Sequence, residues 1–378
     1  MAADVGVMSK PRFIVLGGCG FIGRNFVQYL IENDIASEIR VVDKVPPQTA
    51  WLNPKHQKTF EDPRVVFRSA NLINSGSCEA AFAPNGDSPF DYAVNCACET
   101  KPGQTDPVYK EGILKLSINC ANEAAKQGVK RFIELSDGHM CSSDKAPFKE
   151  DGKPEPWTYV AKWKCQVEEE LKNVPDLKYT VVRPGIVYGL GDRHGLAPRL
   201  VIGAVYRHLG EMMKLLWGRD LRMNTVHVED VCRAILHLAQ RDDTVGQVYH
   251  VVDSGDTTQG DISSVVSDLF DINHDYWGNT LSSICKLFQA DMSSVVEEVN
   301  DKHMGPWAEA CARDGVENTP LTPYIDQELL YNKHLYLDNS KLLSTGFELS
   351  VPRLSKDKLK EILTDYSSMK LFPHSLIL

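Results

Sequence analysis

The sequence predicts a doubly wound α/β fold, in which a parallel sheet carries helices on both of its faces. Up to about residue 252, short apolar runs alternate with segments of helical periodicity, a pattern typical of parallel sheets. The second observation is the stretch of residues 13–26, where an apolar run breaks into glycines and then resumes with helical spacing. A fold of this class binds ligands beyond the carboxyl ends of its strands, so we expect the functional site at that edge.

The glycines of this early stretch are spaced three apart, at Gly17, Gly20 and Gly23. Such spacing lets the turn adopt positive φ, lets a dinucleotide pyrophosphate approach the backbone and lets the helix pack closely on its strand. The helix that begins at Phe21 and Ile22 would then hold the phosphates at its N-terminus. A glycine-rich turn without a ligand explains a lone motif of this kind equally well.

Asp43 strengthens the dinucleotide interpretation. It ends the second expected strand, residues 38–43, and lies 20 residues beyond Gly23. A carboxylate at this place accepts hydrogen bonds from ribose hydroxyls and repels a 2′-phosphate. The spacing therefore favours NAD over NADP, although Lys44 beside it weakens the preference, and an acid that merely ends a strand is the alternative.

Further strands are expected from the apolar runs, and helices from the periodic segments. The strands are residues 64–68, 90–97, 131–135, 179–184 and 247–252, and the helices are residues 109–127, 159–172 and 196–209. Residues 45–63 are polar and contain prolines, so we expect a loop there. The residues expected at the ligand-binding edge, because each ends or follows a strand, are Asp43, Asn71, Ala97, Ser136 and Asp137.

Composition excludes several classes of function. The net charge of −10 and the pI near 5.6 argue against non-specific binding to nucleic acid or to anionic membranes. Residues 1–10 lack the apolar core of a signal peptide, and no run of about 18 apolar residues follows, so we expect a cytoplasmic protein. The 10 cysteines show neither paired CxxC spacing nor histidines at metal-ligand intervals, so we expect no metal site.

Several motifs follow one another along the chain. They are GGCGFIG at residues 17–23, Asp43, RPGIVYGLGD at 183–192, NTVHVEDV at 224–231, GQVYHVV at 246–252 and LDNSKLLSTGFELS at 337–350. In these motifs and in their order the chain resembles the NAD-dependent epimerase/dehydratase family, the extended short-chain dehydrogenase/reductases. The resemblance spans most of the chain, which a chance glycine motif would not do.

The resemblance implies a Rossmann-type NAD-binding domain and a smaller C-terminal α+β domain for the substrate. The first would comprise residues 10–185, completed by about 224–254, and the second residues 186–223 and 255–378. Residues 275–336 match no motif, and we interpret them as helical elaboration on the substrate side. The expected cofactor-binding residues are Gly17, Gly20, Phe21, Ile22, Gly23, Asp43, Asn71, Ala97 and Pro184.

Enzymes of this family use a tyrosine as acid or base, a lysine four residues later, and a serine or threonine after the fifth strand. Because the ordinary pKa of tyrosine is about 10, proton transfer near neutral pH needs a neighbouring cation. Here Trp163 stands four residues after Tyr159, which leaves Lys162 as the nearer cation on that helix face. If Lys164 instead keeps the family's lysine position, Val160 occupies the tyrosine position.

Asp137 takes the place of the family's serine or threonine. A carboxylate cannot donate a hydrogen bond to a substrate carbonyl, and its charge opposes a developing oxyanion. Ser136 is the adjacent candidate hydroxyl, but it should point elsewhere along the strand. His139 is a candidate replacement acid because its pKa is near neutral, whereas a histidine in a loop is more often simply solvated.

Two function hypotheses follow. The favoured one is an NAD(H)-binding protein with an eroded catalytic centre, a pseudoenzyme that serves as a structural, sensing or assembly component. The alternative is an active NAD-dependent oxidoreductase or epimerase, acting on a sugar nucleotide or another hydroxyl or carbonyl substrate through Tyr159, Lys162 or Lys164, with Asp137 or His139. The expected partners are a dinucleotide and either a protein assembly or a second copy of the chain, since many relatives pair through the helices that correspond to residues 109–127 and 159–172.

Overall fold

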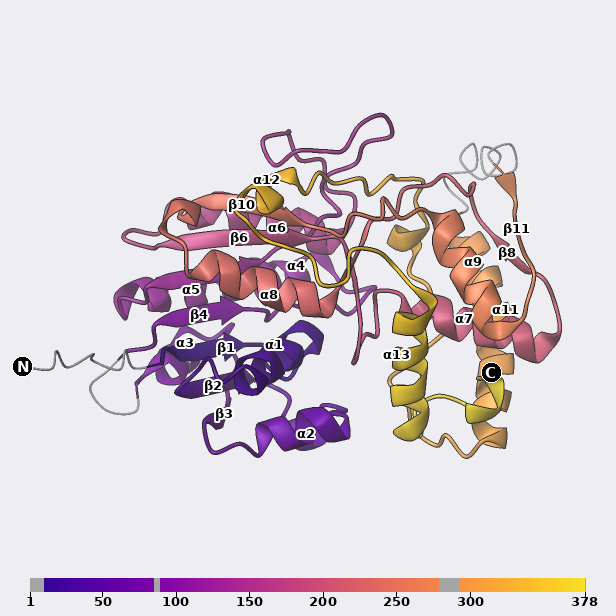
Figure 1. Cartoon of the computed structure of the whole chain (residues 1–378), viewed down its shortest axis with the longest axis horizontal. Helices are drawn as coiled ribbons and strands as arrows, with labels where there is room; N and C mark the ends of the chain where they lie inside the picture. Colours follow the sequence, from indigo (N-terminus) through magenta and orange to yellow (C-terminus); the bar gives the residue numbers. More distant parts are fainter. Residues whose placement is uncertain (1–9, 85–88, 279–291, 378) are drawn as a thin grey trace, which may run out of the picture.

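The central element is a seven-stranded sheet in which every strand runs parallel to its neighbours (Figure 1). The structure, a computed structural model, describes residues 10–84, 89–278 and 292–377. In spatial order the strands are β10 (Gln247–Val251), β6 (Tyr179–Pro184), β5 (Arg131–Leu135), β4 (Tyr92–Asn95), β1 (Arg12–Leu16), β2 (Glu38–Asp43) and β3 (Val65–Ser69). The predicted doubly wound sheet is confirmed, and each strand overlaps a run that the sequence predicts.

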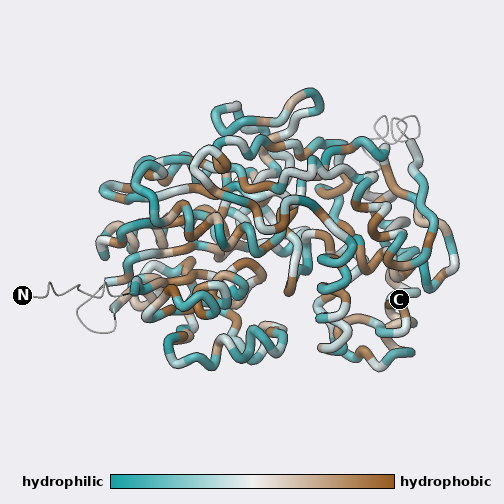
Figure 2. Tube along the Cα trace, viewed as in Figure 1, coloured by the Kyte–Doolittle hydropathy of each residue, from teal (hydrophilic) through white to brown (hydrophobic). Residues whose placement is uncertain are grey.

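Helices cover both faces of the sheet. One face is covered by α1 (Phe21–Glu32) and α8 (Val228–Ala239), which pack side by side and bury Phe26 and Ile235. The other face is covered by α3 (Ser75–Phe82), α5 (Leu116–Lys126) and α6 (Tyr159–Leu171). In Figure 2 the brown, apolar stretches run through the strands and the adjoining helices, so the two cores lie on either side of the sheet.

The helix predicted for residues 109–127 is a composite of three segments. It begins as α4 (Asp106–Tyr109), continues through a π-helical segment at Lys110–Lys115 and ends as α5. The backbone hydrogen bonds therefore change from α-helical to π-helical spacing within this composite helix. Both α4 and the π-helical segment contact α6, so the change lies beside that helix.

The strand order reverses at β1, which pairs with β2 on one side and with β4 on the other. In a doubly wound sheet the two connections leave this point on opposite faces, so a crevice opens beyond the carboxyl ends of these strands. Gly17 follows β1 and is tied to β2 by its N–H, which donates to the carbonyl of Val42 at 2.7 Å. The glycine turn therefore forms the floor of that crevice.

The prediction that residues 45–63 form a loop was wrong. They contain α2 (Pro54–Phe60) and a 3₁₀ turn at Pro47–Thr49. The side chain of Asn53 caps α2 by accepting a hydrogen bond from the N–H of His56 at 2.8 Å, and Pro54 holds the first helical position. Proline at this position and asparagine before it favour a helix start, because the proline needs no N–H there.

A second group of elements packs beside the sheet, at the right of Figure 1. Its helices are α7 (Ala197–Leu209), α9 (Gln259–Phe270), α11 (Met292–Arg313) and α13 (Lys356–Ser368). They share one buried cluster that includes Leu200, Phe270, Trp307 and Phe372. Of the unmatched residues 275–336, helix α11 joins this cluster, whereas residues 279–291 lie outside the described part.

Short strands, turns and one short helix complete the described fold, and several of them pack against the sheet or α8. The paired strands are β8 (Met213–Leu215) with β11 (His274–Tyr276) and β7 (Ile186–Tyr188) with β9 (Thr225–His227), and the remaining short elements are α12 (Ser340–Ser344) and the 3₁₀ turns Asp242–Thr244, Gln327–Leu330 and His374–Leu376. Among the described residues, no helix is both long and apolar enough to cross a membrane.

Candidate cofactor and catalytic cleft

A cleft of about 680 Å³ lies beyond the carboxyl ends of β1, β2, β4, β5 and β6. The glycine turn and Asp43 line one end of it, and Asp137, Val160 and Lys164 line it farther along the sheet. Residues of the second group of elements form the opposite wall. The strand order predicts a ligand site at this place, and the cleft lies there.

Glycine suits positions 17, 20 and 23 for different structural reasons. Gly17 has φ +72°, and a Cβ on it would lie 2.6 Å from the Cα of Ala97. A Cβ on Gly23 would lie 2.4 Å from the carbonyl oxygen of Gly17, so the helix could not pack on the strand. Gly20 is exposed on the cleft side, and a Cβ there would meet only the Gly17 carbonyl, at 3.1 Å. Its bare backbone is thus open to a ligand.

The N-terminus of α1 faces this cleft. Gly20 is the N-cap, and no side chain of the described residues caps the helix by a hydrogen bond. The N–H groups of Phe21, Ile22 and Gly23 precede the first intrahelical bond, which the N–H of Arg24 donates to the Gly20 carbonyl. These N–H groups and the positive end of the helix dipole suit an anion such as a phosphate.

Asp43 is joined directly to the glycine turn. Its Oδ2 accepts a hydrogen bond from the N–H of Cys19 at 3.1 Å, and its Oδ1 accepts one from the N–H of Val45 at 3.0 Å. Burial raises the pKa of this carboxyl above its ordinary value, and the backbone N–H groups act against that rise. Cys19 is buried beside it, and burial raises the pKa of the thiol to about 12, so the thiol stays protonated.

Most of the expected cofactor-binding residues line the cleft, and two do not. Those that line it are Gly17, Gly20, Phe21, Ile22, Gly23, Asp43 and Pro184. Asn71 lies outside it, with its Oδ1 bound to the N–H of Ile73 at 3.2 Å. Ala97 lies under the turn, where its backbone packs against Gly17.

Helix α6 turns Val160 and Lys164 toward the cleft, and Tyr159 and Lys162 away from it. The Tyr159 side chain is 44% exposed and stacks on Tyr109, with ring centroids 5.5 Å apart. The Nζ of Lys162 lies 2.8 Å from the Oδ1 of Asp106, on the same outer side. The structure therefore brings Lys164 into the cleft with Val160 four residues before it, and it does not bring Tyr159 or Lys162 there.

Lys164 is held by a buried polar network that the sequence reasoning missed. Its Nζ donates to the Oε1 of Glu134 at 2.8 Å. The Ser117 hydroxyl donates to the same oxygen at 2.9 Å, and the Asn95 amide donates to the Oε2 at 2.8 Å. Burial acts to lower the pKa of Lys164, but the Glu134 carboxylate outweighs it and raises that pKa. The lysine is therefore a fixed cation. The signal was Glu134 itself, an acid inside an apolar strand.

Ser136 and Asp137 follow β5 but point in different directions. The Ser136 hydroxyl donates to the Oε1 of Glu168, whose carboxylate also accepts from the Nε of Arg183 at 2.9 Å. Asp137 instead binds His139, with its Oδ1 2.7 Å from the His139 Nδ1 and 2.8 Å from the His139 N–H. Asp137 and His139 both line the cleft.

The region after residue 275 contributes to the wall opposite these residues. Glu328, Leu329 and Tyr331 line the cleft, and the Glu328 Oε1 accepts a hydrogen bond from the Tyr159 N–H at 3.0 Å. Burial raises the pKa of Glu328, and the Tyr159 N–H acts against that rise. Sequence reasoning missed these residues, because the contact joins segments with no local pattern in common.

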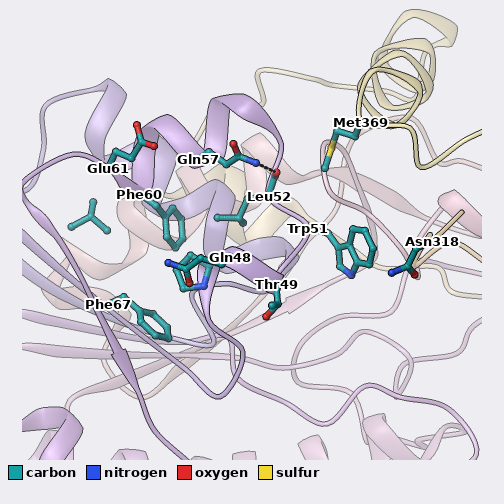
Figure 3. Close-up of a pocket in the computed structure, with 12 residues that line it drawn as sticks. Gln48, Thr49, Trp51, Leu52, Gln57, Phe60, Glu61, Phe67, Asn318 and Met369 are labelled. Atoms are coloured by element: carbon teal, nitrogen blue, oxygen red, sulfur yellow. Dashed lines mark hydrogen bonds between the residues drawn. The ribbon is translucent and has the colours of Figure 1, made fainter. Parts of the chain in front are cut away.

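A second hollow, of about 790 Å³, lies beside α2 and the edge strand β3 (Figure 3). Phe60 and Phe67 line it from α2 and β3, and Trp51 lines it near Asn318 and Met369. Its lining is chiefly apolar and amide, without the glycine turn or paired ionisable groups. In the described ranges, no three His, Cys, Asp or Glu side chains are grouped to hold a metal ion.

The fold and the cleft define a class of protein: a doubly wound α/β chain with the glycine turn, free helix N-terminus and strand-ending acid of dinucleotide sites. The chain belongs to the NAD-dependent epimerase/dehydratase family, whose model matches residues 13–252.

Individual relatives are distant in sequence. The chain is 23% identical over 266 residues to a dTDP-glucose 4,6-dehydratase of Actinoplanes sp., covering 68% of this chain and 80% of that protein. The solved UDP-glucose 4-epimerase of Thermotoga maritima is similar at 20% identity and TM-score 0.65, over 94% of this chain and 99% of its own. The UDP-N-acetylglucosamine 4-epimerase of Methanobrevibacter ruminantium has 18% identity and TM-score 0.68, over 96% and 99%.

Proposed function

We propose that this protein binds NAD(H) in the cleft, with the pyrophosphate at the glycine turn. The observation that carries the proposal is the exposed backbone of Gly20 beside the N–H groups of Phe21 and Ile22, which precede the first intrahelical bond of α1. A pyrophosphate needs such close approach and such donors. When bound, NAD(H) would supply hydride acceptance or donation.

The choice of NAD over NADP rests on Asp43. Its carboxylate is fixed by the N–H groups of Cys19 and Val45, at the end of β2 where the adenosine ribose is expected. The 2′-phosphate of NADP would meet a negative charge there. Lys44 is exposed and its Nζ lies 3.7 Å from a carboxylate oxygen of Glu99, so it is directed toward another acid.

We further propose that the protein does not carry out the tyrosine-dependent chemistry of its family. Val160 occupies the position four residues before Lys164, and valine can neither donate nor accept a proton. Tyr159 faces the outer side of α6, where it stacks on Tyr109. A structural, sensing or assembly role, or a chemistry that uses a different acid, agrees with a cofactor held without the family's tyrosine. In such a role the exposed Val108 and Tyr159 belong to the helices through which relatives pair.

Titration with NADH, followed by its fluorescence and by calorimetry, tests cofactor binding. Wild type should bind NADH, and Gly20→Val should weaken binding at least tenfold, because its side chain fills the place of the phosphates. Gly218→Val is the matched control, since a Cβ at Gly218 meets nothing within 4 Å. Equal binding by both variants would contradict the proposed site.

Turnover assays with UDP-glucose and dTDP-glucose test the second part. We expect no epimerisation or dehydration that depends on Tyr159, so Tyr159→Phe should leave both NADH binding and turnover unchanged. Loss of a measurable sugar-nucleotide turnover in Tyr159→Phe would contradict this part and support the family's chemistry.

A further inference from the structure

We propose that Asp137 and His139 form an acid–base pair that exchanges a proton with a hydroxyl or carbonyl oxygen of a substrate in this cleft. The proposal rests on the proposed binding of NAD(H), because it assigns a chemistry to the same cleft. It replaces the missing tyrosine and serine or threonine of the family by a histidine and the acid that orients it.

Asp137 and His139 lie in the geometry of an oriented acid–base pair. The Oδ1 of Asp137 lies 2.7 Å from the Nδ1 of His139, and the same oxygen accepts the His139 N–H at 2.8 Å. The carboxylate therefore holds both the backbone and the ring. A carboxylate on Nδ1 fixes the proton of the neutral imidazole on that nitrogen and leaves the lone pair on Nε2. The Trp157 ring packs against the imidazole at 5.5 Å between centroids and restricts its rotation.

The Nε2 of His139 is accessible and has no hydrogen-bond partner among the described residues. It is also not enclosed by the protein, whereas the Nδ1 of His250 is enclosed and has no hydrogen-bond partner among the described residues. The His139 side chain is 23% exposed and lines the cleft. The free nitrogen is therefore open to a ligand in the cleft while the other nitrogen is held.

The position of the pair along the sheet also suits this role. Asp137 follows β5, the place from which the family's serine or threonine acts, and Pro184 at the end of β6 lines the cleft beside it. The glycine turn lies at the other end of the same cleft. A dinucleotide that places its phosphates at the turn would therefore extend toward Asp137 and His139.

Charged groups around His139 support a proton-transfer role. Burial acts to lower the pKa of His139, but the Asp137 carboxylate outweighs it and raises that pKa, with a smaller contribution from Glu328. On the other side, Lys164 is a cation near Asp137 and helps to keep that carboxyl ionised. A carboxylate on Nδ1 stabilises the imidazolium that forms when Nε2 takes up a proton.

The proton balance of the step follows from these positions. In the oxidation direction the substrate O–H bond breaks and its proton goes to Nε2, which gives an imidazolium paired with Asp137. The C–H bond breaks with its electron pair, a hydride that NAD⁺ accepts when bound, and the product is a carbonyl. In reduction the carbonyl carbon accepts a hydride, which NADH would supply when bound, to form the C–H bond, and the Nε2 proton goes to the carbonyl oxygen. The substrate class is therefore a primary or secondary alcohol or the matching aldehyde or ketone.

Chemical modification tests the accessibility of Nε2 without requiring turnover. Diethyl pyrocarbonate should modify His139, as found by peptide mass spectrometry, and NADH should protect it. His374, on the exposed C-terminal turn, is the unprotected control, and the enclosed His56 and His250 are the unreactive controls. Failure of His139 to react, or equal reaction of His139 with and without NADH in a protein that binds NADH, would overturn the proposal.

Nitrogen NMR of the full chain tests Asp137 as the positioning residue. The neutral His139 ring should carry its proton on Nδ1, and Asp137→Asn should lower the pKa of the His139 ring. Asp144→Asn, a change in the nearby exposed loop, is the control. A proton on Nε2, or an unchanged pKa in Asp137→Asn, would overturn the pairing. A merely structural Asp137 would change stability but not this titration.

Turnover with aldehydes, ketoses and 2-oxo acids and NADH completes the test. His139→Gln should retain NADH binding and lose activity on the order of 100-fold or more. Activity that survives in His139→Gln would overturn the proposal, and so would a protein that binds NADH and turns over none of these compounds. If the wild-type protein does not bind NADH, the result refutes the proposed cofactor site instead.

Discussion

The Nζ of Lys164 lies 2.8 Å from the Oε1 of Glu134, and both side chains are buried at the base of the cleft. The pair joins α6 to β5, and Ser117 and Asn95 satisfy further hydrogen bonds of the carboxylate. A buried charge is stable only with such partners, because each ion loses its hydration on folding. Lys164 is therefore a structural cation at the cleft as well as the candidate equivalent of the family's lysine.

Glu134→Gln should lower the free energy of unfolding by about 3–5 kcal/mol, because it leaves the Lys164 charge buried without a counter-ion. Urea denaturation at neutral pH measures this effect. Glu169→Gln is the control, since its pair with Lys172 is exposed and contributes under about 1 kcal/mol. Equal, small effects in both variants would show that water solvates the Lys164 ammonium group once the Glu134 carboxylate is removed.

Asp43→Ala should weaken NADH binding and reduce the preference for NADH over NADPH by about tenfold, or about 1.4 kcal/mol. The carboxylate both holds the N–H of Cys19 and repels a 2′-phosphate. Dissociation constants for the two dinucleotides give the ratio directly. Asp62→Ala, before β3, is the matched control, and an unchanged ratio in Asp43→Ala would remove Asp43 from the site.

Acidification should destabilise the fold through buried neutral histidines. Burial lowers the pKa of His56 to about 3, of His250 to about 3 and of His303 to about 4. In the unfolded chain the pKa of each imidazole is about 6.5, so below that pH the unfolded state binds protons that the folded state does not. Stability is therefore lost as pH falls from about 6.5 toward 4, by up to about 1.4 kcal/mol per pH unit for each histidine.

His56→Gln isolates one of these contributions. Over the same pH range the variant should lose less stability than wild type, because it lacks one histidine that takes up a proton on unfolding. The slope of its unfolding free energy against pH should be smaller by up to about 1.4 kcal/mol per pH unit. Urea denaturation at several pH values measures the two slopes. Parallel curves would mean that His56 titrates alike in both states.

Asp192→Ala should lower stability by roughly 3 kcal/mol or more, because it leaves several backbone donors without an acceptor. The two oxygens of Asp192 accept from the N–H groups of residues 194–197, at 2.7–3.0 Å, just before and within the start of α7. Thermal and urea denaturation measure the loss. The exposed Asp220→Ala is the control, and equal effects would indicate that water replaces the carboxylate.

Local patterns in the sequence predicted the sheet and the glycine turn well. The strands are short apolar runs bounded by polar residues. The positive φ of Gly17 and the contact of Gly23 with the Gly17 carbonyl are local, although the backbone of Ala97 also crowds Gly17 from a distant strand. Helix α2 was missed because Asn53 and Pro54 were interpreted as loop residues, although the same pair is a good helix start.

The catalytic side of the cleft could not be predicted to the same extent. The helical spacing of residues 159–164 fixes the angles between side chains, but it does not fix which face points at the cleft. Packing of α6 on the sheet decides this, and it turns Val160 and Lys164 inward. Glu328 reaches the N-terminus of α6 across 169 positions of sequence, a contact that no local pattern encodes.

The sequence by itself determined the fold class and the dinucleotide-type turn, because short-range hydrophobic periodicity and backbone sterics set these features, and the order of its motifs indicated the family. Only the tertiary structure decided that Lys164 pairs with Glu134, that Tyr159 lies on the outer side, and that His139 is held by Asp137 with Nε2 open to the cleft. The physical reason is that burial and electrostatic pairing depend on which distant segments pack together, and the energy of a charge depends on that environment.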